Sequence, residues 1–228
     1  MKRGIFYAVG LGPGDPELVT RKAIRILEEC PVIAAPRTHG DGMLALSIAQ
    51  QAANLEGKAI LSITFPMERN EERRRTNYEK AASDIEAYLS AGQDVALLNL
   101  GDVSIYATGG YLAAILQARG YETELVPGIP SFCAAAARLG VSLTERDTPL
   151  HILPAGSVPL EEALELPGTK VLMKAGRKLP EVISALEQRR LLEKAALVEN
   201  CGLPGERVCT ELSQEAEFGY FTTVIVKE

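Results

Sequence analysis

The chain has 228 residues, of which 46% are hydrophobic and 24% charged, and its formal net charge is −6. This length suffices for one large or two small domains of ordinary globular composition. The acidic balance excludes a globally basic surface for nucleic acid, and no apolar stretch approaches the ~20 residues that span a bilayer. We therefore expect a cytoplasmic protein without a nucleic-acid or membrane partner. Two histidines and four scattered cysteines predict neither a metal site nor a disulfide framework.

Strand-like and helix-like segments alternate in the first half of the chain. Apolar runs predict strands at 6–9, 32–35, 59–63, 95–100 and 123–126. Apolar periodicity predicts helices at 16–29, 43–53, 71–90 and 108–119. Such alternation is typical of a mostly parallel sheet with helices on both faces. Right-handed crossovers would bring the ends of the first and fourth strands to the same edge of that sheet.

The Pro-Gly-Ile-Pro segment at 127–130 predicts a joint between two domains. We expect an N-terminal α/β domain over residues 1–126 and a C-terminal α/β domain over residues 127–228. A helix is expected to begin at Ser131 and to end before Gly140. Another is expected at 180–190, among strand-like runs at 150–154, 170–174, 195–199, 207–212 and 221–227. Few helices per strand predict a mixed or antiparallel sheet in this domain.

Two glycine-rich turns each follow an apolar run. The first is Val-Gly-Leu-Gly-Pro-Gly-Asp-Pro at 9–16, and the second is Gly-Asp-Val-Ser-Ile-Tyr-Ala-Thr-Gly-Gly at 101–110. Glycine lets a ligand approach the main chain, and ligands of open α/β sheets bind beyond the carboxyl ends of the strands. The two turns therefore predict a small-molecule site built largely from backbone.

The acidic residues in these turns argue against a phosphate-rich ligand. Asp15 stands where a dinucleotide fingerprint needs its third glycine, and Lys58 is followed by Ala59 rather than by the Ser or Thr of a P-loop. Asp15 and Asp102 suit a ligand with positive charge or sugar hydroxyls better. For Asp15 a second interpretation stays open, in which it only caps a helix that begins at Pro16.

Five blocks in order resemble the tetrapyrrole methylases, which use S-adenosylmethionine. The first is Val-Gly-Leu-Gly-Pro-Gly-Asp-Pro-Glu-Leu-Val-Thr-Arg-Lys-Ala at 9–23, and the others lie at 101–108, 126–132, 171–174 and 199–206. Within the family, the blocks at 127–132, 152–155, 173–177 and 220–222 are most similar to enzymes that methylate C20 of precorrin-2, or of its cobalt form, in cobalamin biosynthesis. One departure is Val103, where the family usually has a proline. Valine restores a backbone N–H there.

The resemblance implies two α/β domains with a ligand cleft between them, S-adenosylmethionine as cofactor, and a homodimer. Carried over by motif, the expected cofactor contacts are Pro13, Gly101, Asp102, Ile105, Ser131, Phe132, Met173 and Cys201. A methyl transfer to ring carbon ends with loss of a proton, which a weak base could accept. No residue is assigned to that role, for which the candidates are Asp15, Tyr106 and Lys174.

A tetrapyrrole with many carboxylates would require local cations despite the acidic total. We expect Arg37, Lys174 and Arg177 to bind the substrate. Weaker candidates are Arg69, Lys178 and the run 73–75, whose neighbouring glutamates are typical of a solvated helix. His39 is expected in a surface loop.

Three alternatives stay open at this point. One is a family member that methylates another ring position or a related substrate. Another is a dinucleotide-dependent oxidoreductase, which the missing third glycine disfavours. The last is a non-catalytic tetrapyrrole carrier, which would bind the pigment without needing the first glycine turn.

Overall fold

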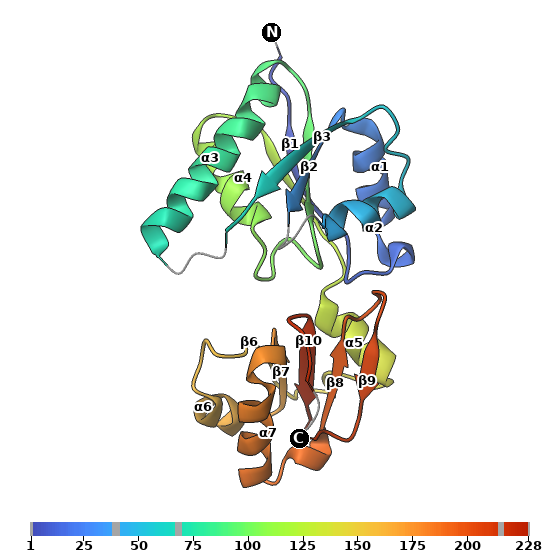
Figure 1. The fold of residues 1–228 in the computed structure, drawn as a ribbon, viewed down its shortest axis with the longest axis vertical. Coiled ribbons are helices and arrows are strands. Elements are labelled where there is room, and N and C mark those ends of the chain that lie inside the picture. Colours follow the sequence, from blue (N-terminus) through green and yellow to red (C-terminus); the bar gives the residue numbers. More distant parts are fainter. Residues whose placement is uncertain (1, 38–41, 67–69, 214–216, 228) are drawn as a thin grey trace. The chain divides into compact units, whose positions relative to one another are not determined.

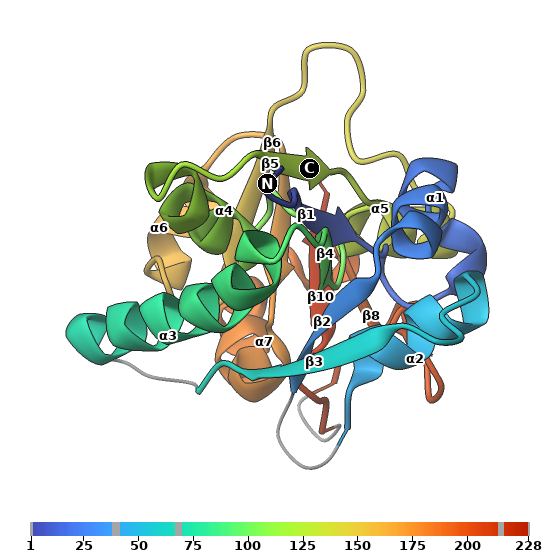
Figure 2. The same ribbon diagram turned by 90° about the horizontal axis from the view of Figure 1, so that it is seen from above.

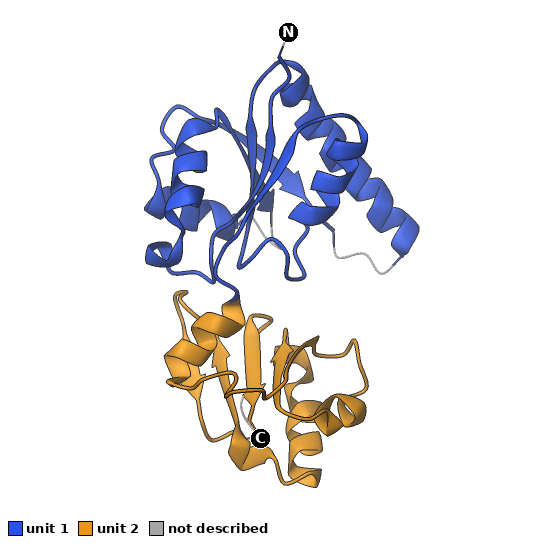
Figure 3. Ribbon diagram, turned by 180° about the vertical axis from the view of Figure 1, so that it is seen from behind, with its two compact units in different colours: residues 1–130 blue, residues 131–228 orange. Residues whose placement is uncertain are grey.

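The computed structural model describes residues 2–37, 42–66, 70–213 and 217–227. It divides into two compact units, Met1–Pro130 and Ser131–Glu228 (Figure 3). The sequence places the joint after residue 126, and the structure places it after Pro130, at the end of the same Pro-Gly-Ile-Pro segment. His39 and Arg69 lie outside the described residues. Within the described ranges, each helix is too short or too polar to cross a membrane.

The first unit contains a five-stranded parallel sheet in the order β3-β2-β4-β1-β5. Its strands are β1 Phe6–Gly10, β2 Val32–Arg37, β3 Ala59–Thr64, β4 Val95–Asn99 and β5 Thr123–Val126. Its α-helices are α1 Arg21–Glu29, α2 Leu44–Ala52, α3 Glu71–Ser90 and α4 Gly109–Ala118. The expectation of a mostly parallel sheet is confirmed.

Helices cover both faces of this sheet, with α1 and α2 on one face and α3 and α4 on the other (Figures 1 and 2). Alternate side chains of β1 and β4, such as Phe6 and Leu97, pack with Ile85 of α3 and Leu112 of α4 in one fully buried cluster. Because side chains alternate along a strand, the intervening residues face α1 and α2. Helices therefore pack against side chains on both faces of the sheet.

The second unit contains a mixed five-stranded sheet in the order β6-β7-β10-β8-β9. Its strands are β6 Leu150–Pro154, β7 Thr169–Met173, β8 Ala195–Glu199, β9 Arg207–Cys209 and β10 Thr222–Val226. Its helices are α5 Ser131–Leu139, α6 Leu160–Glu165 and α7 Leu179–Gln188, with short 3₁₀ helices at Gly176–Lys178 and Leu192–Lys194. Among the described strands of this unit, β6 and β7 pair in parallel and the other neighbours pair antiparallel, which confirms the predicted mixed sheet.

The helix predicted at 16–29 is wrong at its start. Pro16–Leu18 forms a 3₁₀ helix, and the α-helix begins only at Arg21, because Thr20 caps it by accepting from the Ala23 N–H at 3.2 Å. Asp15 caps the 3₁₀ helix through a 2.9 Å bond from the Glu17 N–H. Two caps in succession therefore break the predicted helix. Helix α6 was not predicted, because its six residues are too few to show a periodic pattern.

Candidate functional site

The two glycine-rich turns meet at the carboxyl ends of β1 and β4. Gly12 and Gly101 exchange backbone hydrogen bonds, with N–O distances of 3.2 Å for the Gly12 donor and 2.7 Å for the Gly101 donor. The Leu11 N–H donates to the carbonyl of Asn99 at 2.9 Å. The prediction that the first and fourth strands end at one edge is confirmed, and both turns are tied together there.

The loop after β5 packs on these turns backbone to backbone. A Cβ on Gly10 would lie 2.6 Å from the nitrogen of Gly128, and a Cβ on Gly128 would lie 2.3 Å from the carbonyl oxygen of Gly101. Cβ contacts below 3.0 Å essentially never occur, so neither position accepts a side chain without moving main chain. The loops after β4, β1 and β5, which are neighbouring strands, thus form a cradle of bare backbone, here called the glycine cradle.

The side chain of Asp102 links the loops after β4 and β5 of the glycine cradle by hydrogen bonds. Its Oδ2 accepts from the Gly128 N–H at 2.9 Å, and its Oδ1 accepts from the Ser104 N–H at 2.8 Å and from the Ser104 hydroxyl. Burial alone would raise the pKa of Asp102, but the hydrogen bonds from Ser104, Gly128 and Val103 together outweigh it and hold the pKa below its ordinary value. An ionised carboxylate therefore sits among the loops while being only 9% exposed.

Val103, the departure from the family pattern, has a role in this arrangement. Its backbone N–H is one of the donors that lower the pKa of Asp102, and a proline would lack that donor. Its side chain is buried in the core that β1 and β4 share with α3 and α4. Valine at this position thus supplies a donor that proline lacks, and its side chain packs in the core.

Sequence reasoning missed Asn99, the last residue of β4. Its Oδ1 accepts from the Gly109 N–H at 3.1 Å, and its Nδ2 donates to the Leu97 carbonyl at 3.1 Å. The side chain is buried and links the end of the strand to the first residue of α4. Both ends of the second glycine turn are therefore fixed. The available signal was a lone amide in an otherwise apolar strand, directly before the Gly-Asp pair.

The remaining candidates of the first unit differ in exposure. Pro13 is buried, Ile105 is partly buried, and Arg37 is exposed at the end of β2. Tyr106 is 50% exposed and has a φ of 49°, in the left-handed region that non-glycine residues rarely adopt. Such strained positions cluster at functional sites. The arginines at 73–75 are exposed in the first turns of α3, as the solvated-helix interpretation predicted.

In the second unit, the loops after β7 and β8 leave the same edge of the sheet, on either side of the start of β10. Met173 ends β7, and Lys174 follows it with a φ of 59°. Asn200 follows β8 with a φ of 51°. The ammonium group of Lys174 lies over the ring of Tyr220, 5.7 Å from its centroid. This edge therefore carries two left-handed residues and a cation.

The other candidates of the second unit are placed as follows. Cys201 is half-buried, and burial, together with the Glu206 charge, raises the pKa of its thiol to about 11. The thiol therefore stays protonated and is no nucleophile. Ser131 and Phe132 begin α5, with the Phe132 side chain buried, and Arg177 is exposed just after the Lys174 loop.

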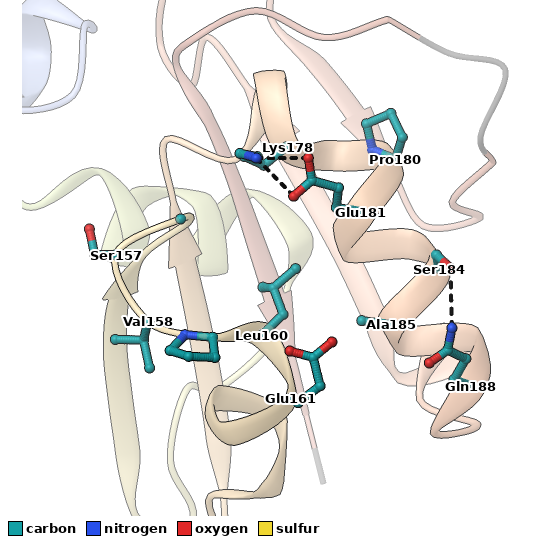
Figure 4. Close-up of a pocket in the computed structure, with 12 residues that line it drawn as sticks. Ser157, Val158, Leu160, Glu161, Lys178, Pro180, Glu181, Ser184, Ala185 and Gln188 are labelled. Atoms are coloured by element: carbon teal, nitrogen blue, oxygen red, sulfur yellow. Dashed lines mark hydrogen bonds and ion pairs between the residues drawn. The ribbon is translucent and has the colours of Figure 1, made fainter.

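A separate cavity of about 810 Å³ lies in the second unit between the 156–161 segment and α7 (Figure 4). Among the predicted site residues, Lys178 alone lines it within the described part of the chain. The Lys178 ammonium bonds both carboxylate oxygens of Glu181, at 2.7 and 2.9 Å. Its charge is therefore already matched by a neighbour on the same helical segment. In the described residues, His, Cys, Asp and Glu side chains form no group of three that could hold a metal ion.

Comparisons with known proteins agree with the sequence resemblance. The chain is 35% identical over 80% of its length to a probable cobalt-precorrin-2 C(20)-methyltransferase of Methanocaldococcus jannaschii, covering 77% of that protein. It is 32% identical over 99% of its length to the cobalt-precorrin-2 C(20)-methyltransferase of Salmonella typhimurium, covering 97% of that protein.

A solved structure shares the fold. The uroporphyrin-III C-methyltransferase of Thermus thermophilus, complexed with S-adenosyl homocysteine, superposes with a TM-score of 0.69 at 24% identity, over 99% of this chain and 98% of that one. Residues 6–217 match the family described as Tetrapyrrole (Corrin/Porphyrin) Methylases. This chain belongs to the tetrapyrrole methylase family.

Proposed function

We propose that this chain transfers the methyl group of S-adenosylmethionine to C20 of precorrin-2, or of its cobalt-chelated form, in cobalamin biosynthesis. One observation carries the proposal: a glycine cradle organised by Asp102 in a chain that matches a C20-methyltransferase almost from end to end. The alternative, methylation at another ring position, becomes an outcome of the test.

The residues of the cradle fit the proposed cofactor. The cradle brings the loops after β1, β4 and β5 into direct backbone contact, and further main-chain groups of these loops are proposed to bind the adenine ring and the amino-acid chain. The ionised, largely buried carboxylate of Asp102 tolerates a positively charged sulfonium nearby. The bound cofactor supplies an electrophilic methyl group. Pro13 and Ile105 of the first unit, and Ser131, Phe132, Met173 and Cys201 of the second, are the further proposed contacts.

The protein's own contribution to this reaction is positioning. Orienting two reactants lowers a barrier by roughly 7–11 kcal/mol in favourable cases. Of the three candidate bases, Asp15 is engaged as a helix cap, whereas Tyr106 and Lys174 hold left-handed backbone conformations. That difference favours Tyr106 and Lys174 for contact with the substrate. Arg37, Lys174 and Arg177 are proposed to bind its carboxylates.

Calorimetry with S-adenosylhomocysteine tests the cofactor assignment. Binding at micromolar concentration is expected, and its absence at high micromolar concentration would remove the methylase proposal. Turnover of metal-free and cobalt-loaded precorrin-2, measured in parallel, then decides which form is the substrate. A protein that binds the tetrapyrrole but never consumes S-adenosylmethionine would instead support the carrier alternative.

Two finer statements complete the proposal. The chain is proposed to act as a homodimer, which light scattering coupled to size-exclusion chromatography would test, with a monomeric mass as the contradicting result. It is also proposed to act in the cytoplasm. Fractionation of the source cells should then recover it with soluble markers, and recovery with membranes would contradict that location.

A further inference from the structure

A buried carboxylate in the second unit holds the segment 217–221, which leads into β10. Glu199, the last residue of β8, accepts from the backbone N–H of Gly219 through one oxygen. Its other oxygen accepts from Nε of Arg207 at 2.6 Å. The side chain of Glu199 is only 7% exposed, so this carboxylate is committed to the interior of the unit rather than to solvent.

Arg207 contacts the same segment at two further residues, Glu217 and Phe218. Its Nη2 donates to the carbonyl of Glu217 at 2.6 Å, and its guanidinium lies over the ring of Phe218, 4.1 Å from the centroid. Burial alone would raise the pKa of Glu199, but the bonds from Arg207 and Gly219 hold it below the ordinary value. Three consecutive residues, 217–219, are therefore held by one ion pair, whose carboxylate is buried and whose arginine side chain is 48% exposed. It is here called the Glu199–Arg207 clasp.

The clasped segment also touches the loop that carries Lys174. A Cβ on Gly176 would lie 1.8 Å from the carbonyl oxygen of Gly219, so the two backbones are in direct contact. The Ala175 N–H donates to the Thr222 carbonyl at 2.9 Å, and the Thr222 hydroxyl donates to Gly219 at 2.7 Å. A shift of Gly219 would consequently move the loop after β7.

Two side chains depend on this contact. Lys174 leaves the loop in a left-handed conformation, and Tyr220, next to Gly219, lies under its ammonium group. Phe221 packs edge-on against Tyr220, with ring centroids 5.3 Å apart, and both rings are partly exposed. A cation beside exposed aromatic surface suits a flat, carboxylate-bearing macrocycle.

We propose that Glu199 and Arg207 are positioning residues for the tetrapyrrole: through Gly219 and Gly176 they set the placement of Lys174 and Tyr220. The inference rests on the proposed function for the identity of the ligand. Loss of the clasp should therefore weaken binding of the tetrapyrrole far more than it weakens binding of S-adenosylhomocysteine.

Two variants test the clasp separately. Glu199→Gln places an amide N–H₂ against one of the two donors, and Arg207→Lys keeps the positive charge but loses the planar fork. A hydrogen bond to a charged group changes an equilibrium by about tenfold or more. We expect amide exchange in 174–178 and 217–221 to accelerate about tenfold in both variants. The Kd and KM for precorrin-2 should rise by a similar factor, with the S-adenosylhomocysteine Kd within about twofold of wild type.

The control is Glu86→Gln, which weakens the ion pair of Glu86 with Arg119 in the first unit, where the two side chains are 32% and 26% exposed. It should leave amide exchange in these segments and the binding constants of both ligands unchanged. Unchanged exchange in both clasp variants, or faster exchange with unchanged precorrin-2 binding, would overturn the inference. Amide exchange and precorrin-2 binding can be measured without turnover. A wild-type protein that binds precorrin-2 but does not methylate it would therefore refute the proposed function. The inference about the clasp would still be tested by exchange and binding in the two variants.

Discussion

Replacing Asp102 by alanine removes the acceptor that joins the loops after β4 and β5. Four donors lose their partner: the N–H and hydroxyl of Ser104, the N–H of Gly128 and, with the smallest effect on the pKa of Asp102, the N–H of Val103. Ser104 is exposed, so water can satisfy both of its donors. The Gly128 N–H is partly buried against Gly10 and Gly101. The loss of its hydrogen bond to the charged carboxylate therefore contributes most to the decrease in the free energy of unfolding.

The expected loss of stability follows from that single bond. A hydrogen bond to a charged group contributes about 1.5–3 kcal/mol, so Asp102→Ala should lower the free energy of unfolding by about 2 kcal/mol. The glycine cradle would lose its shape before the rest of the first unit unfolds. S-adenosylhomocysteine should accordingly bind about tenfold more weakly, which corresponds to about 1.4 kcal/mol.

Urea unfolding and calorimetry with S-adenosylhomocysteine measure the two effects in one preparation. Asp94→Ala is the matched control, because Asp94 accepts from the Ile5 N–H at 2.7 Å at the opposite end of β4. That variant should lose stability without losing affinity. Arg37→Ala should also keep its affinity for the cofactor. A larger effect of Arg37→Ala than of Asp102→Ala on cofactor binding would refute this placement of the two ligands.

Three further predictions concern the same features. Gly128→Ala places a Cβ 2.3 Å from the Gly101 carbonyl oxygen and should cost about 1–3 kcal/mol or more, so an unfolding midpoint equal to wild type would contradict the cradle. The folded-state pKa of Asp102 is depressed, so its stabilisation is fully present above the ordinary value of 3.8 and is lost as pH falls through the lower folded-state pKa. Wild type and Asp102→Asn should therefore differ in unfolding free energy by a constant amount near neutrality and converge in acid, and a difference that widened in acid would be contrary to the reasoning. Burial raises the pKa of the Cys30 thiol to about 12 and that of Cys201 to about 11, so mass spectrometry after iodoacetamide treatment at neutral pH should find both barely modified, and rapid labelling of either would be the opposite result.

Local patterns predict most of the fold. The strands at 123–126 and 150–154 begin and end where the apolar runs do. The helix at 71–90 also has the predicted bounds, because Asn70 caps its start and a glycine turn follows its end. The helix expected from Pro16 failed because two capping residues, Asp15 and Thr20, lie close together. Which cap starts the α-helix is decided by packing on the sheet, a non-local interaction.

The site was predictable only in part, for the same physical reason. Glycine spacing and strand alternation place the two turns at one sheet edge, and the structure brings them into direct hydrogen bonding. The partner of Asp102 is 26 residues away, at Gly128, and the partner of Glu199 is 20 residues away, at Gly219. No local pattern relates such pairs. The donors in both pairs are backbone N–H groups, which every residue except proline has, so the residue types do not reveal them. The hydrogen bonds of Asp102 and Glu199 to these donors are therefore seen only in the structure.

The ring position of the new methyl group tests the central claim most directly. Wild-type protein would be incubated with precorrin-2, or its cobalt form, and S-adenosylmethionine labelled with carbon-13 in the methyl group. Nuclear magnetic resonance of the product would then locate the label. The proposed function predicts a single labelled methyl on C20, with equimolar S-adenosylhomocysteine released. A label on any other ring carbon, or substrate recovered unmethylated while cofactor is bound, would contradict it.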